Sequence, residues 1–223
     1  MNASDARELR RTLSEAESKA LLGDFDVPGV PDRVVATSDA AVAAAGELGY
    51  PGVVKLSGER IAHKTERGLV RLALGGAEQV EAAAIELLAA AIPDDGDVAL
   101  LVAPMLRAAR ELIVGLHDDP QFGRCVMVGI GGVLAEAVAD VAFRLAPIDA
   151  TDAHEMLDDL RAAAILGPVR GQPAVDREAV VRILLGLSRL ATDRPDVLSV
   201  DVNPLLIVEG TPIAVDALVE VRT

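Results

Sequence analysis

The sequence predicts an α+β protein whose sheets are mixed or antiparallel. Two observations lead to this class: helical segments alternate irregularly with short apolar runs, and several of those runs follow one another as hairpin-linked strands do. A regular strand–helix alternation, which would predict one doubly wound parallel sheet, is not found along the chain. The 223 residues suit one large domain or two small subdomains, and the 51% hydrophobic content allows a substantial core.

The first half of the chain predicts helices separated by short strands. Ser14-Glu15-Ala16-Glu17 has the form of a capping box and predicts a helix that ends near Gly23. Ser38 is expected to cap an alanine-rich helix that stops at Gly49, just before Pro51. A further helix is expected at 77–91, and strands are expected at 34–36, 52–56 and 69–74.

The second half predicts mostly strands, with two helices among them. Strands are expected at 98–103, 111–116, 126–128, 133–138, 141–145, 197–202, 205–208 and 213–215. Helices are expected at 151–166 and 176–191. A seam between two subdomains falls near 98–104.

The composition excludes several classes of function. The net charge of −14 repels a phosphate backbone, and the 2% aromatic content leaves few rings on which bases can stack, so no nucleic-acid partner is expected. The single cysteine, Cys125, excludes an intramolecular disulfide framework. Because neither a secretory signal nor an apolar run of about 18 residues is found, we expect no membrane partner and a cytoplasmic location.

The sharpest local pattern is Asp201-Val202-Asn203-Pro204 with Asp216 downstream. If the strands on either side of Glu209-Gly210 form a hairpin with a two-residue turn, Asn203 lies directly opposite Asp216. Asp201 lies two residues before Asn203 and therefore on the same face. Three oxygen-bearing side chains then converge among apolar neighbours, and such hard donors suit magnesium or manganese.

A plainer interpretation of this cluster also stands. A carboxylate at a strand end often accepts hydrogen bonds from backbone amides and binds no metal. Glu-Gly is also an unfavourable pair for a type I′ turn, and Pro204 is able to shift the register.

Three segments are suited to handling phosphate, although each signal is weak alone. Lys55 ends a predicted strand, where its ammonium can act as a point charge on a phosphate. Gly129-Ile130-Gly131-Gly132 allows backbone to approach a ligand closely, or simply makes a turn, and it is not a Walker A motif. His63 lies in a polar loop and is either a phosphoryl carrier or an ordinary solvated histidine.

Together these segments resemble the ATP-grasp β subunit of the NDP-forming acyl-CoA synthetases, the family of the ADP-forming acetate–CoA ligases. The resemblance covers about residues 13–221 and depends on the order and spacing of short motifs. Those motifs are Lys19, 49–51, 53–55, 63–68, 111–115, 129–136, 140–147, Arg170-Gly171, 201–204 and Asp216. A more distant likeness is to the β subunit of succinyl-CoA synthetase.

The resemblance implies an ATP-grasp fold in which two α+β subdomains, approximately 13–35 plus 104–221 and 36–103, hold the nucleotide between their sheets. It implies ATP or ADP and Mg²⁺ as cofactors and a CoA-binding α subunit or fused α domain as partner. The reaction implied is acyl-CoA + ADP + phosphate ⇌ acid + CoA + ATP, through a phosphohistidine on the partner. The chain would then be an ADP-forming acid–CoA ligase subunit that needs this partner for full activity.

The resemblance also implies roles for individual residues. Lys55 and the glycines Gly131 and Gly132 would contact the nucleotide, Glu111 would contact the nucleotide or its ribose, and Val102, Ala103 and Met105 would form a hinge beside adenine. Asn203 and Asp216 would hold magnesium, with Asp201 close to the phosphoryl group. His63 corresponds to the histidine implicated in phosphoryl relay.

Three residues depart from the family pattern: Leu69 replaces a second glycine, Ala103 replaces a glutamine, and Ser199 replaces an acidic residue. Leu69 raises the question whether the loop needs a positive φ at that position. These departures keep a second reading open, in which the chain is a non-catalytic nucleotide-sensing ATP-grasp module that regulates a partner protein. A stand-alone ATP-grasp ligase is a third and weaker alternative.

Overall fold

Two separate β-sheets organise the chain in the computed structural model, which describes residues 10–58, 61, 67–132 and 139–223. The larger unit takes in 10–13, 17–29 and the described part of 107–223, and the smaller unit takes in 14–16 and the described part of 30–106. Every strand pair within the two sheets is antiparallel, which confirms the predicted α+β class.

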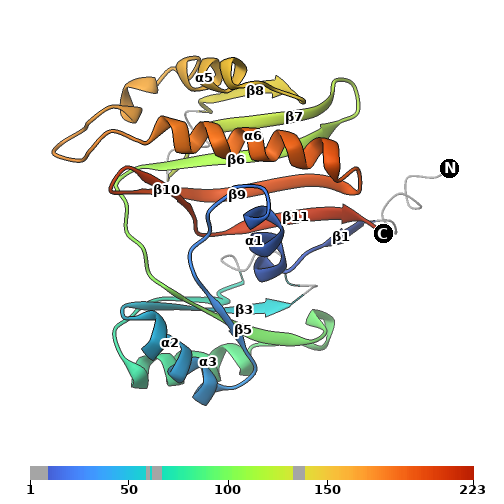
Figure 1. Cartoon of the computed structure of the whole chain (residues 1–223). Coiled ribbons are helices and arrows are strands. Elements are labelled where there is room, and N and C mark those ends of the chain that lie inside the picture. Colours follow the sequence, from blue (N-terminus) through green and yellow to red (C-terminus); the bar gives the residue numbers. More distant parts are fainter. Residues whose placement is uncertain (1–9, 59–60, 62–66, 133–138) are drawn as a thin grey trace. The chain divides into compact units, whose positions relative to one another are not determined.

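The larger unit is built on a seven-stranded sheet (Figure 1). Its members are β1 (Arg10–Thr12), β6 (Glu111–Asp119), β7 (Gly123–Ile130), β8 (Val141–Leu145), β9 (Val197–Val208), β10 (Thr211–Ala214) and β11 (Ala217–Arg222). They lie in the order β1-β11-β9-β6-β7-β8, with β10 paired to β9 beyond the end of β11. The long strand β9 therefore has β6 on one side and, in succession, β11 and β10 on the other.

One face of this sheet is covered by helices. Helices α5 (Ala150–Asp158) and α6 (Arg177–Asp193) contribute their apolar sides to a core shared with β6, β7 and β9 (Figure 1). Asp149 and Asp176 cap the two helices by accepting backbone N–H bonds, as expected for N-cap aspartates. The larger unit also contains a short 3-10 helix, η2 (Ala163–Leu166), and helix α1 (Glu15–Gly23) from residue 17 onward. The first two residues of α1 belong to the smaller unit. The opposite face carries exposed apolar side chains, among them Phe143 and Leu145 of β8 and Leu218 of β11.

The smaller unit has a four-stranded sheet in the order β2 (Arg33–Val35), β5 (Val98–Pro104), β3 (Gly52–Gly58), β4 (Val70–Leu74). Helices α2 (Ser38–Leu48) and α3 (Ala77–Ala89) pack on one face, and their alanines allow a close approach. A 3-10 turn, η1 (Pro93–Asp95), precedes β5. The core between helices and sheet holds alternate residues of β3 and β5, so the intervening residues belong to the other face.

Several expected elements are confirmed, and others are corrected. The strand 141–145 and the first helix are found where the pattern predicts them. The expected strands 197–202 and 205–208 form one strand, and the expected helix 151–166 is interrupted after Asp158. Thr37, not Ser38, caps α2. The edge strand β1 and strand β11 were not predicted, and the expected strand 133–138 lies outside the described residues.

The unit boundaries differ from the expected subdomain boundaries in three places, because residues 14–16, 30–35 and 104–106 belong to the smaller unit. Strand β2 pairs with β5, so residues 30–35 belong to the smaller unit and not with the C-terminal part of the chain. Among the described helices, none is both long enough and apolar enough to cross a lipid bilayer.

Candidate functional site

The C-terminal hairpin has the register that the sequence predicts. Ala214 pairs with Leu205 in β9, and Ala217, at the start of β11, pairs with Val202 in the same strand. The register therefore does not change between β10 and β11. Glu209-Gly210 has φ angles of 49° and 90°, so both residues adopt the left-handed conformation of a type I′ turn. The unfavourable turn sequence does not prevent this hairpin.

Three oxygen-bearing side chains belong to this junction. Asn203 lies in β9, and Asp216 lies between β10 and β11, so the unchanged register places the two opposite each other. Asp201 pairs with Leu218 on one side and with Gly115 of β6 on the other. The pairing of β9 with β6 shifts beside Asn203, and such bulges commonly re-aim side chains next to functional sites.

The charges at the junction are of like sign. The pKa of Asp201 is raised, first because neighbouring atoms partly desolvate the carboxylate and second because Asp216 adds negative charge. A cation between the two carboxylates would relieve this repulsion. No group of three or more His, Cys, Asp or Glu side chains suited to a metal is found within the described part of the chain. A cation here would thus also need the amide oxygen of Asn203, and two carboxylates with one amide fit a hard divalent ion.

Glu111 and the glycine segment after β7 meet on the neighbouring strands. The Gly131 amide donates to the Glu111 carbonyl over 2.8 Å, and a Cβ at Gly131 would lie 3.1 Å from the Glu111 Cβ. Gly132 has φ of 93°, a conformation that side chains other than glycine rarely adopt. Because β6 lies between β7 and β9, Glu111 and the two glycines share one end of the sheet with Asn203.

Lys55 belongs to the smaller unit and is buried there. It lies in β3 between Val70 of β4 and Leu101 of β5, on the face away from α2 and α3. Its Nζ donates to Glu15 Oε1 over 2.8 Å. The sequence did not indicate Glu15 as a functional residue, because it lies 40 positions away and its local pattern indicated only a helix start.

The three predicted hinge residues differ in the face of the sheet to which their side chains belong and in whether their backbone groups are already hydrogen-bonded. Val102 is fully buried in the core against α2 and α3, so its side chain is unable to face a ligand on the other side of the sheet. A hinge role for Val102 beside adenine would therefore involve its backbone and not its side chain. Ala103 belongs to the other face, and the Met105 amide already donates to the Pro51 carbonyl over 2.8 Å.

The predicted relay residue, His63, lies outside the described residues. Arg67, which follows that segment, is held by Asp95 in a two-pronged ion pair with distances of 2.7 and 3.0 Å. The Arg67 guanidinium, together with the Ile92 amide, holds the pKa of Asp95 below its usual range. Arg67 is therefore engaged in the fold of the smaller unit.

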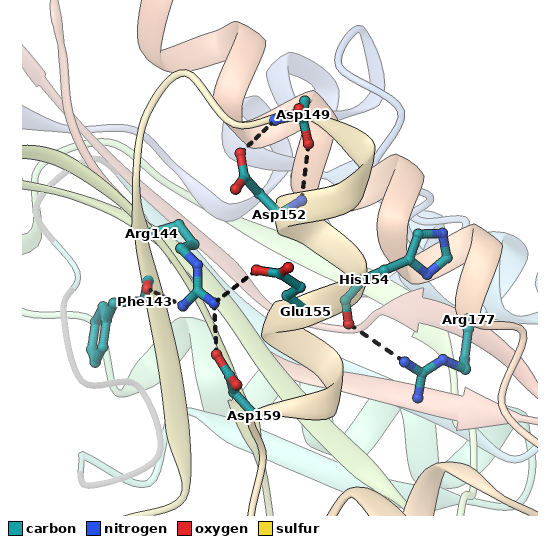
Figure 2. A network of polar contacts seen from close by, with 8 residues as sticks. All are labelled: Phe143, Arg144, Asp149, Asp152, His154, Glu155, Asp159 and Arg177. Atoms are coloured by element: carbon teal, nitrogen blue, oxygen red, sulfur yellow. Dashed lines mark hydrogen bonds and ion pairs between the residues drawn. The ribbon is translucent and has the colours of Figure 1, made fainter.

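Arg144 lies in the segment 140–147, one of the motifs that carry the family resemblance, and its partners are residues of the fold. Its guanidinium donates to Asp159 over 2.7 Å and lies 3.6 Å from Glu155, both of which belong to or directly follow α5 (Figure 2). The hydrogen bond to Asp159 is the main reason that the pKa of Arg144 is raised. Arg144 thus ties β8 to the helix that covers it.

Two of the departures from the family pattern have physical explanations. Leu69 is buried in the core of the smaller unit and has no positive φ, whereas Gly68 has φ of 67°, so only Gly68 needs to be glycine. The Ser199 hydroxyl donates to Glu220 on β11 over 2.9 Å, so a carboxylate still lies beside this position. Glu220 was not predicted, because it approaches Ser199 only across the β9–β11 pair.

Comparisons with known proteins agree with this architecture. A family model described as an ATP-grasp domain matches residues 4–221. The β subunit of acetate–CoA ligase [ADP-forming] I from Pyrococcus furiosus is 36% identical over 215 residues, which cover 95% of this chain and 93% of that protein. Acetate–CoA ligase [ADP-forming] I from Archaeoglobus fulgidus is also 36% identical, but this chain covers only 30% of it.

Solved structures agree with the sequence relatives. An acetyl-coenzyme A synthetase from Candidatus Korarchaeum cryptofilum, in complex with coenzyme A and Ca-AMPCP, is similar with a TM-score of 0.88 and 31% identity. The match covers 95% of this chain and 94% of that one. A second structure of that enzyme, with Mg-AMPPCP and a phosphohistidine segment pointing towards the nucleotide site, gives a TM-score of 0.81 at 32% identity over 95% and 93% of the two chains.

Proposed function

The chain belongs to the ATP-grasp β subunits of the ADP-forming acyl-CoA synthetases, and from this membership we propose the part it takes in their reaction. It binds ATP or ADP together with Mg²⁺ and exchanges the terminal phosphoryl group with a phosphohistidine on a CoA-binding α partner. The observation that carries the proposal is the register of the C-terminal hairpin, which sets Asn203 opposite Asp216 with Asp201 on the same strand as Asn203.

The oxygen donors at the hairpin fit a magnesium ion. Asn203 and Asp216 would hold it, and the ion would neutralise charge on the phosphoryl group in transfer. Asp201 lies beside these ligands and would be close to the phosphoryl group, with the ion between the two negative charges. Glu111 would contact the nucleotide or its ribose, and the backbone of Gly131 and Gly132 would lie close to the ligand because no side chain intervenes.

In the smaller unit, Lys55 would contribute a positive charge to the nucleotide phosphates. An ammonium has three N–H donors, so its bond to Glu15 is compatible with a further acceptor. Ala103 and Met105 would lie beside adenine. Val102 would contribute through its backbone only, since its side chain is in the core.

A partner is needed because the family reaction uses CoA and an acyl group as well as a nucleotide. The relatives have two arrangements: a separate β subunit of nearly the same length in Pyrococcus furiosus, and a longer chain of which this sequence covers 30% in Archaeoglobus fulgidus. We propose that this chain acts with a CoA-binding α subunit or a fused α domain.

Reconstitution tests the proposal directly. The purified chain should bind MgADP by calorimetry but produce no ATP from acyl-CoA, ADP and phosphate. Adding the CoA-binding α chain should give ATP synthesis, and a panel of acyl-CoAs would identify the acyl group. The proposal is overturned if the chain alone turns over with contaminants excluded, or if it binds no adenine nucleotide.

His63 is proposed as a phosphoryl relay, because a neutral imidazole can attack phosphorus and later release the group. In the reconstituted complex, ATP labelled at the γ-phosphate should leave acid-labile, base-stable label on this chain. His63→Ala should abolish the label and turnover while nucleotide affinity stays within a few-fold. If label is found on the partner alone in both proteins, His63 is not a relay.

A further inference from the structure

Among the described residues, Glu15 and Lys55 form a deeply enclosed ion pair. The two side chains are 0% and 8% exposed, and the Nζ–Oε1 distance is 2.8 Å. Other ion pairs in the structure include at least one side chain that is about a third exposed or more. An enclosed charge without an opposite partner is strongly unfavourable, so this pair is a specific arrangement.

The backbone fixes both ends of the pair. Lys55 lies in an inner strand, with β4 bonded on one side and β5 on the other, so its Cα has little freedom. Glu15 is the first residue of α1, where the helix dipole favours a negative charge. Between these fixed points runs the flexible four-carbon stem of lysine, whose ammonium takes its position from whatever it binds.

Local secondary structure does not require a glutamate here. Helix α1 needs only a residue that tolerates a first-turn position, and Glu17 in the same turn serves the fold in a different way, by pairing with Arg11 in an exposed setting. What distinguishes Glu15 is that its carboxylate reaches the lysine that we propose for nucleotide phosphate. The pairing therefore bears on the direction in which that ammonium points.

We infer that Glu15 is a positioning residue, which holds the ammonium of Lys55 in place for the phosphates of the bound nucleotide. The inference rests on the proposed function, since it assumes that Lys55 meets phosphate. Glu15 itself would not touch the nucleotide, because two negative groups repel. Glu15 would act on nucleotide binding only through Lys55. A change at Glu15 should therefore affect ligands that carry phosphate and spare ligands that do not, which a purely structural residue would not do.

The test compares the affinities of MgADP and adenosine in the full-length chain by calorimetry. Glu15→Gln should weaken MgADP binding about 10-fold, because a hydrogen bond between charged groups is lost and the ammonium is no longer held. Adenosine, which has no phosphate, should bind as it does to the wild type. Glu17→Gln is the matched control: it removes one carboxylate from the same helical turn and should leave both affinities within two-fold.

A double variant separates positioning from general damage to the fold. In the Lys55→Met background, adding Glu15→Gln should change MgADP affinity by less than two-fold, because the residue through which Glu15 acts is gone. This double variant carries neither enclosed charge, so it should fold even if a single variant is too unstable to measure. Glu15→Asp keeps the charge on a shorter arm and should give an intermediate loss of MgADP affinity.

The outcomes are distinct. If the wild type binds MgADP and Glu15→Gln binds it with the same affinity, the positioning role is overturned and the proposed function stays intact. Equal losses for adenosine and MgADP, or an undiminished effect of Glu15→Gln in the Lys55→Met background, also overturn it, since Glu15 would then act through the fold. If the wild type binds no MgADP, the proposed function fails, and the positioning role fails with it.

Discussion

The aspartates of the two units contrast in what their neighbours do to them. In the smaller unit, Asp95 is buried and lies against Arg67, and its pKa is lowered. In the larger unit, Asp201 keeps contact with solvent but lies near Asp216, and its pKa is raised. The ionised form is therefore stabilised at the more deeply enclosed Asp95 and destabilised at the more accessible Asp201.

The contrast separates a charge that its neighbours stabilise from a charge that its neighbours destabilise. Asp95 also accepts the Ile92 amide, so its two oxygens are committed within one local structure that ends η1. At the hairpin, partial desolvation and the nearby charge of Asp216 both disfavour the ionised form of Asp201, and a bound cation would offset this. Burial alone would have pointed to Asp95 as the special residue, whereas the sign of the neighbouring charge points to Asp201.

The largest expected effect is on magnesium at the hairpin. Asp216→Asn and Asn203→Ala should each weaken magnesium-dependent nucleotide binding by about 10-fold or more, because each removes one oxygen donor or one charge from the ion. Calorimetry over a magnesium titration measures this loss. Asp193→Asn, an exposed change on α6, is the control and should leave the magnesium dependence unaltered.

Unchanged magnesium dependence in both variants, with circular dichroism like that of the wild type, would contradict the ligand assignment. The raised pKa of Asp201 would then not indicate a metal site.

A smaller effect is expected when the satisfied pair is broken. Because the folded-state pKa of Asp95 lies below its unfolded value, the pair stabilises the protein fully above about pH 4. This contribution decreases below that pH and is lost as the pH falls through the lower folded-state pKa. Asp95→Asn should therefore lower the melting temperature at pH 7, and its difference from the wild type should shrink on acidification to pH 3.

The control for this pH series is Glu86→Gln, which breaks the exposed ion pair with Arg71 and should change the melting temperature little at any pH. A difference between Asp95→Asn and the wild type that stays constant from pH 7 to pH 3 would show that the Asp95 charge does not stabilise the fold.

The smallest expected effect has the opposite sign. In metal-free protein with chelator present, Asp201→Asn should slightly raise the free energy of unfolding at pH 7, because it removes an ionised group that is partly desolvated and also repelled by Asp216. The gain should stay below about 1 kcal/mol, since the side chain is accessible to water. Urea unfolding measures it, and a loss of stability would show that Asp201 is already satisfied within the fold.

Much of the candidate site followed from residue order. The positions of Asn203 and Asp216 about a two-residue turn were predictable, because strand pairing has a fixed period and each residue has one partner across a hairpin. The resemblance to a family depended on motifs that are contiguous in sequence, and the comparisons bear that resemblance out.

Other features escaped the sequence because they join distant segments. Strand β1 is three residues long and exists only through pairing with β11 at the other end of the chain. The orientation of Val102 into the helix-facing core depends on which face of the smaller sheet α2 and α3 cover. Neither is encoded in a local pattern.

The sequence by itself determined the α+β class, the family, and the opposed pair Asn203 and Asp216, because periodicity and turn length act over a few neighbouring residues. Only the tertiary structure decided which charges are satisfied: Glu15 reaches Lys55, Arg67 reaches Asp95, and Glu220 reaches Ser199. These partners come from different elements that packing brings together. A charge is stabilised or strained by whatever lies within a few ångströms of it, and that neighbourhood is a property of the folded chain.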